Sequence, residues 1–136
     1  METWQKGEIA VLEVIKRAIE KGYTPNRPVV EGTRYDLILE RNGSMYRVQV
    51  KYVDGKWSKT AGASVCGLTK RNRNSKSVRT YQTNEIDALI AFLPQTGKLC
   101  WFDANVIEGK SSLTIRHEPA KNKQSKNCYH SWDYEW

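Results

Sequence analysis

Apolar and polar residues alternate along two short segments that flank the dipeptide Asn42-Gly43. The apolar positions are Tyr35, Leu37 and Leu39 on one arm and Tyr46, Val48 and Val50 on the other. A period of two residues is typical of β-strands, and Asn-Gly readily takes the positive φ values of a tight type I′ turn. The pattern therefore predicts a hairpin over residues 35–51.

The two-residue loop also predicts which residues of this hairpin face each other. Arg41 pairs with Ser44, and counting outward along both arms pairs Asp36 with Gln49. Opposed residues share a face of the sheet, and Lys51 returns to that face two residues later. A carboxylate, an amide and an ammonium group thus form one polar patch.

Two interpretations of this polar patch remain open. An ordinary amphipathic hairpin would expose it to water. Against that, Ile38 lies on the same face, which indicates a surface that is only partly wet. A lysine in a partly buried place needs an anionic partner, and Asp36 can supply one to Lys51.

Residues 6–21 show apolar positions at three- and four-residue spacing, which predicts a helix that Gly22 ends. The apolar positions are Val11, Leu12, Ile15, Ala18 and Ile19. Glu8 stands in line with this stripe. It is explained equally well as a first-turn acid that the helix dipole stabilises, or as a carboxylate that projects toward the polar patch.

The rest of the chain predicts several shorter elements and a polar tail that ends in aromatic residues. The elements are an extended edge segment over 23–30, strands over 63–68, 86–93, 99–102 and 113–116, and a turn over 95–98. We expect the aromatic residues of the tail to pack on this chain or on a partner chain; they are Tyr129, Trp132, Tyr134 and Trp136.

At 136 residues the chain fits one domain, and its net charge of +7 favours a polyanionic partner, of which nucleic acid is the first candidate. Five cations without an acid occur between residues 70 and 79, within a basic loop predicted around 54–83. They are Lys70, Arg71, Arg73, Lys76 and Arg79. We expect them to bind DNA phosphates, although a charge run is often only a solvated loop.

Composition also limits the location and the chemistry. Three cysteines without zinc or redox spacing favour a reducing compartment, and no leader or membrane span is visible, so we expect a cytoplasmic protein without a membrane partner. Only two histidines are present, which argues against a histidine-based metal nuclease or a hydrolase triad. No glycine-rich Walker loop is found, so no nucleotide cofactor is expected.

At Asp36, Gln49, Val50 and Lys51 the sequence resembles the PD-(D/E)-x-K nuclease superfamily, in which an Asp opens a hairpin strand and an acid-x-Lys trio lies on the next. With Lys6-Gly7-Glu8 on the first helix, it looks most like a bacterial group I intron-encoded homing endonuclease of that type. The resemblance implies an α/β fold (α+β, with a mixed sheet): a restriction-endonuclease-like core in a single nuclease domain over 1–136.

The resemblance further implies a Mg²⁺-dependent, site-specific endonuclease that hydrolyses phosphodiester bonds in double-stranded DNA. Asp36, Gln49, Lys51 and Glu8 would be catalytic. Asp36, Glu8 and the Val50 carbonyl would be metal ligands, and Lys51 would orient the attacking water and stabilise charge. Cutting two strands with one site per chain calls for a dimer or tetramer.

The sequence departs from the superfamily pattern at Gln49, because an amide oxygen carries no charge where an acid is expected. Weaker metal binding or reliance on Glu8 should follow. Two alternatives therefore stay open: a Holliday-junction resolvase, and a catalytically inactive DNA-binding module of the same fold.

Overall fold

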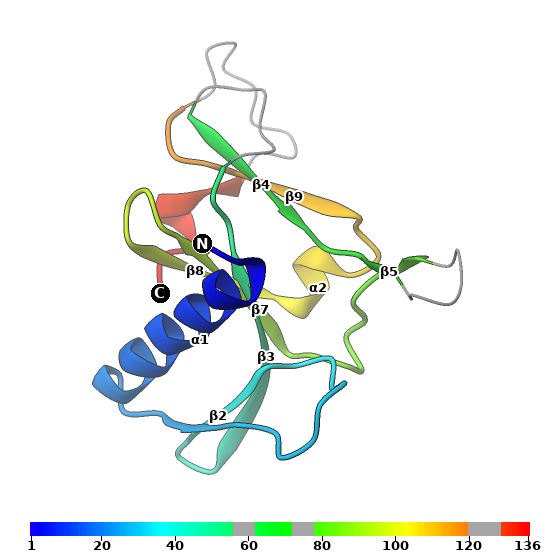
Figure 1. Ribbon diagram of the computed structural model, residues 1–136. Helices are drawn as coiled ribbons and strands as arrows, with labels where there is room; N and C mark the ends of the chain where they lie inside the picture. The colour runs from blue at the N-terminus through cyan, green and yellow to red at the C-terminus, as the bar shows by residue number, and fades with distance from the viewer. Residues whose placement is uncertain (56–61, 72–77, 120–128) are drawn as a thin grey trace.

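The computed structural model describes residues 1–55, 62–71, 78–119 and 129–136. An N-terminal helix packs across one face of a five-stranded mixed sheet, and a three-stranded sheet packs on the opposite face (Figure 1). The helix is α1 (Thr3–Glu20), and the five-stranded sheet has the order β1 (Thr24–Asn26), β2 (Leu37–Arg41), β3 (Ser44–Tyr52), β7 (Ala88–Leu93), β8 (Lys98–Asp103). This arrangement is the expected mixed α and β fold.

Smaller elements complete the molecule. They are the three-stranded sheet β10 (Tyr129–His130), β9 (Ser112–Arg116) and β4 (Ala63–Gly67), the two-stranded ribbon β5 (Lys70–Arg71) and β6 (Val78–Arg79), the short helix α2 (Ala104–Ile107) and the 3-10 turn η1 (Ser131–Asp133). The segment predicted as a basic loop around 54–83 therefore contains β4 and the β5–β6 ribbon. Within the described residues, no helix combines the length and the apolarity needed to cross a bilayer.

The β2–β3 hairpin has the predicted register. Arg41 pairs with Ser44 and Leu37 pairs with Val48, so the loop contains two residues. Asn42 and Gly43 have φ values of 53° and 81°, as the predicted turn requires. Turn chemistry and strand alternation are both local, which is why the sequence predicted this element correctly.

Helix α1 has the predicted end, and its buried stripe overlaps the predicted one at Val11 and Ala18 but not at Leu12 and Ile19. Gly22 follows its last turn with φ 88°. The buried residues are Ala10, Val11, Val14 and Ala18, whereas Leu12 is 52% exposed and Ile19 is 61% exposed. Small alanine side chains allow the helix to approach the sheet closely, and Ile9 and Ile15 pack at the border of this core.

Two cores lie on the two faces of the five-stranded sheet. Val48 and Val50 face α1, together with Ile90 of the neighbouring strand β7. The alternate residues Leu89 and Ala91 face a second core that includes residues of β4 and β9. The parallel pairing of β3 with β7 sets which face each β3 side chain takes.

The edges of the sheet also follow the sequence pattern. Strand β1 is at one edge, where Pro25 costs no ladder hydrogen bond. All six residues of β7 are buried at the centre of the molecule, and β8 returns beside it. Three of the four C-terminal aromatics, Tyr129, Tyr134 and Trp136, pack on the cores of this chain, whereas Trp132 is 45% exposed. Tyr134 stacks on Phe102 at 4.6 Å, and the Trp136 backbone nitrogen donates to the Leu99 carbonyl at 2.8 Å.

Candidate active site

Asp36 directly precedes strand β2, just outside the region where β2 pairs with β3. The ladder ends at the pair Leu37 and Val48, and the backbone nitrogen of Asp36 donates to that same Val48 carbonyl at 2.8 Å. The predicted pairing of Asp36 with Gln49 is therefore not formed, because the regular ladder stops one residue before it. Because the chain departs from the ladder here, the Asp36 side chain reaches the edge of β3. Its Oδ2 atom accepts a hydrogen bond from the Val50 backbone nitrogen at 2.8 Å.

The Val50 carbonyl points toward the same edge. The N–H and C=O groups of one strand residue face the same neighbour. The Val48 carbonyl and the Val50 amide both form hydrogen bonds with Asp36 on this side of β3, whereas the Val53 amide donates in the opposite direction to the Phe92 carbonyl of β7. The Asp36 carboxylate and the Val50 carbonyl therefore lie along one open strand edge.

Gln49 and Lys51 project from the face of β3 that is opposite to α1. Their partners on β7 are Leu89 and Ala91, which belong to the second core. Lys51 is partly buried there, and its Nζ lies 5.6 Å from the centre of the Tyr81 ring. The structure thus brings Asp36, Val50 and Lys51 to one end of β3, with Gln49 one residue earlier.

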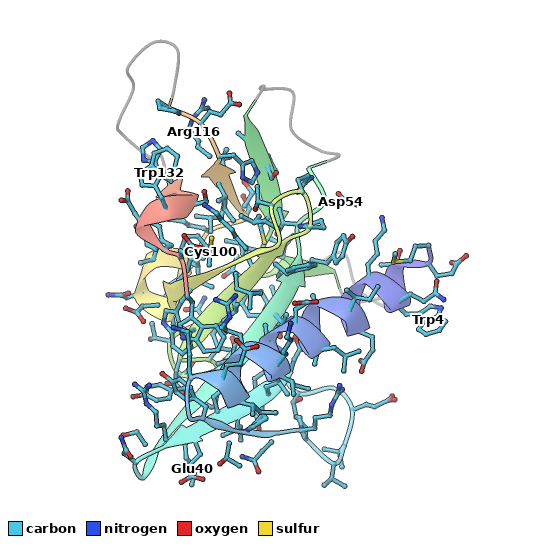
Figure 2. The ribbon with its side chains drawn as sticks, turned by 90° about the vertical axis from the view of Figure 1, so that its left-hand side faces the viewer. Trp4, Glu40, Asp54, Cys100, Arg116 and Trp132 are labelled. Carbon is cyan, nitrogen blue, oxygen red and sulfur yellow. The ribbon has the colours of Figure 1, made fainter. Side chains whose placement is uncertain are left out.

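A cavity of about 540 Å³ opens at this end of β3. It is lined by Thr3, Lys6 and Gly7 of α1, by Val50, Lys51, Tyr52 and Asp54, and by Val65, Cys66 and Gly67 of β4. Lys6 and Asp54 form an ion pair of 2.9 Å across it, each 21% exposed. Figure 2 shows Asp54 above the N-terminal half of α1, whereas Trp4 points away from the molecule.

Glu8 is placed differently from the other predicted site residues. Its carboxylate accepts a hydrogen bond of 2.6 Å from Arg27 and is 47% exposed. Gly7, and not Glu8, is among the residues that line the cavity. Glu8 precedes the buried Val11 by three residues and the exposed Leu12 by four, so it lies at the border of the buried stripe and is not buried with it.

Three of the five predicted DNA-binding cations, Lys70, Arg71 and Arg79, lie in the β5–β6 ribbon. Lys70 pairs with Arg79 across it, and Arg71 follows in β5. The Arg79 side chain is 63% exposed and contacts Glu85 at 3.2 Å. Arg73 and Lys76 lie outside the described residues.

The two described cysteines are buried and structural. Burial raises the pKa of Cys66 to about 11, and the positive charge of Lys51 opposes this rise. Burial likewise raises the pKa of Cys100 to about 11. Neither thiol is a nucleophile at neutral pH, since the reactive form is the thiolate. The chemistry of the site therefore rests on oxygen donors and lysine.

The donors at the strand edge suit a hard divalent cation. Mg²⁺ is usually held by one or two carboxylates together with other oxygen ligands and water. Asp36 supplies a carboxylate, Val50 a carbonyl and Gln49 an amide oxygen, all of which are hard donors. Over the described part of the chain no group of three His, Cys, Asp or Glu residues could hold a metal. Any ion here depends on a mixed set of donors with little negative charge.

The sequence analysis did not find two residues near this site. Asp54 follows β3 and lines the cavity, and Tyr81 follows β6 and contacts Lys51. Neither belongs to a motif or a periodic pattern. Lys6 was found only through the resemblance at Lys6-Gly7-Glu8.

Comparison with known proteins gives a matching family model and a similar solved structure. The sequence model described as PD-(D/E)XK endonuclease matches residues 1–136. The structure is similar to that of a bacterial homing endonuclease, I-Ssp6803I, with a TM-score of 0.79 and 26% sequence identity over 99% of this chain and 89% of that chain. A search of curated proteins finds no match. With a family match over its whole length, the chain belongs to the PD-(D/E)XK endonuclease family.

Proposed function

We propose that this protein is a Mg²⁺-dependent endonuclease that cuts double-stranded DNA at specific sites, as a homing endonuclease does. The observation that carries the proposal is the Asp36 carboxylate bound to the Val50 amide beside Lys51. Support comes from the endonuclease family of the chain and from its similarity to a solved homing endonuclease.

Each residue of the site has a distinct role in this proposal. The cation would be held by Asp36, the Val50 carbonyl and Gln49, and when bound it would polarise the scissile phosphate and a water molecule. Lys51 donates a hydrogen bond to the attacking water and stabilises the negative charge that develops on the phosphate. The hydrogen bond from Val50 fixes the Asp36 carboxylate in place before the substrate arrives.

Glu8 is the proposed second carboxylate, acting directly or through water. In the structure its carboxylate pairs with Arg27, so it must leave Arg27 before it can bind the cation. Replacing Arg27 by alanine should then tighten Mg²⁺ binding, as measured by the Mg²⁺ concentration that gives half-maximal cleavage. A Glu8→Gln variant in the same background should cancel that gain.

The proposed partner is duplex DNA held by cations. A net charge of +7 attracts a polyanion, and the Arg79 guanidinium on the β5–β6 ribbon is 63% exposed, within reach of a phosphate. Lys70, Arg71, Arg73 and Lys76 are proposed to join it. The affinity should fall steeply as salt rises, since each phosphate contact releases counterions.

We further propose that two or four copies act together. Each chain has one site, whereas a double-strand break needs two. The outer side of α1 carries large apolar side chains: Trp4 is 72% exposed, Leu12 is 52% exposed and Ile19 is 61% exposed. Such a stripe supports self-association through this helix. Sedimentation of the native protein and of a Leu12→Glu variant measures the subunit number.

The decisive test is incubation of the purified protein with plasmid DNA that contains candidate sites, with Mg²⁺ and with EDTA. Cleavage that requires Mg²⁺ and yields discrete fragments is the expected result. DNA binding without any cleavage would identify the inactive binding module instead, an alternative that the uncharged Gln49 favours. Preferential cutting of a four-way junction over long duplexes would identify a resolvase.

A further inference from the structure

We propose that Tyr81 is a positioning residue whose ring fixes the ammonium group of Lys51 in the active site. The role rests on the proposed nuclease function, because it is Lys51 that would contact the attacking water. Tyr81 follows the β5–β6 ribbon, thirty residues after Lys51, so no sequence pattern connects the two.

The ring itself is held rigidly. Tyr81 is 3% exposed and belongs to the second core, in the same cluster as Cys66 and Leu68. Cys66 also lines the cavity beside Lys51. A ring packed at core density has little freedom to move, so it offers a fixed surface to any side chain that lies against it.

Lys51 lies against this ring, with Nζ 5.6 Å from the ring centre. An aromatic face attracts a cation within about 6 Å of its centre. A lysine side chain has a flexible four-carbon stem, so its charge needs such a contact to occupy one position. The ring therefore restricts the ammonium group to the end of β3 where Asp36 and the cavity are.

Arg34 connects the same ring to the metal-binding side of the site. Its Cζ lies 4.4 Å from the Tyr81 ring centre, and its Nε lies 3.0 Å from Glu85 in an ion pair whose side chains are 14% and 15% exposed. Its Nη2 also donates to the Thr80 carbonyl at 3.0 Å. Arg34 precedes Asp36 by two residues, so the contacts that fix the ring also limit where the Asp36 carboxylate lies.

The test compares two substitutions in the same core. Tyr81→Leu removes the ring that contacts Lys51, and Phe102→Leu removes a buried ring that contacts Tyr134 instead. Both should destabilise the fold. Only Tyr81→Leu should lower kcat, by about tenfold with KM unchanged, because small misplacements of a catalytic group slow the reaction strongly. Tyr81→Phe keeps the ring and should retain the native kcat.

A second measurement does not depend on activity. The ring should shift the NMR signals of the Lys51 ε-methylene protons, assigned with a Lys51→Arg variant, and the shift should vanish in Tyr81→Leu and persist in Tyr81→Phe. An active protein without this shift, or an equal loss of kcat in Phe102→Leu, overturns the positioning role. If the shift is present but native protein does not cut DNA with Mg²⁺ or Mn²⁺, the nuclease function is wrong.

Discussion

Asp36 offers the sharpest test of the proposed chemistry, because its carboxylate has two separable roles. It accepts a hydrogen bond from the Val50 backbone nitrogen at 2.8 Å, and it supplies the negative charge for a cation. Asp36→Asn keeps an oxygen acceptor of the same size but removes the charge. Asp36→Ala removes both. The pair of variants therefore separates folding from catalysis.

The magnitudes follow from these two roles. A hydrogen bond to a charged group contributes about 1.5–3 kcal/mol to stability, so Asp36→Ala should lose about 2 kcal/mol and Asp36→Asn clearly less. Loss of the metal-binding charge should cost about 3 kcal/mol or more in the transition state, which is about a hundredfold or more in rate. Both variants should therefore cut DNA about a hundredfold or more slowly than the native protein, while only Asp36→Ala is strongly destabilised.

Three measurements on the native protein and both variants make the comparison. Urea unfolding gives the stability, a gel-shift titration without metal gives the affinity for DNA, and a plasmid time course in Mg²⁺ gives the rate. Both variants should bind DNA at least as tightly as the native protein, because they lose a negative charge. Native cleavage rates in Asp36→Asn would refute the role of the carboxylate as a metal ligand.

Three further predictions concern the fold. Burial raises the pKa of Asp87, but the hydrogen bonds from Arg47 and its positive charge lower that pKa more, so the net pKa lies below its usual value of 3.8. The stability that the ionised Asp87 contributes is therefore complete above about pH 4 and is lost as the pH falls further. Arg47→Met should flatten this acid dependence in urea unfolding curves; an unchanged curve would contradict it. In a variant whose other cysteines are replaced by serine, Cys66, with its pKa raised to about 11, should resist a disulfide reagent at about pH 8 until the protein unfolds. Rapid modification of the folded protein would show that Cys66 is accessible. Gly43→Ala should lower the free energy of unfolding by about 1–2 kcal/mol because φ at Gly43 is 81°, whereas Asn42→Gly should be tolerated. Equal unfolding midpoints for the two variants would argue against the strained turn.

The sequence by itself determined the elements whose interactions are local. The alternation on both sides of Asn42-Gly43 determined the register of the hairpin, because a turn and a period of two residues need no distant partner. Gly22 determined the end of α1, and a continuous apolar run predicted the buried strand β7. The hairpin pattern also predicted that Asp36, Gln49 and Lys51 lie near one another, and the family resemblance supplied their expected roles.

Only the tertiary structure decided how these elements meet. The helix buries Val14 and exposes Leu12, because close approach to the sheet selects one of two overlapping apolar stripes. The Asp36 carboxylate turns onto the Val50 amide because the ladder ends beside it. Tyr81 lies against Lys51 because the second core brings together residues far apart in the chain. Contacts of this kind depend on packing in three dimensions, which hydrophobic periodicity does not encode.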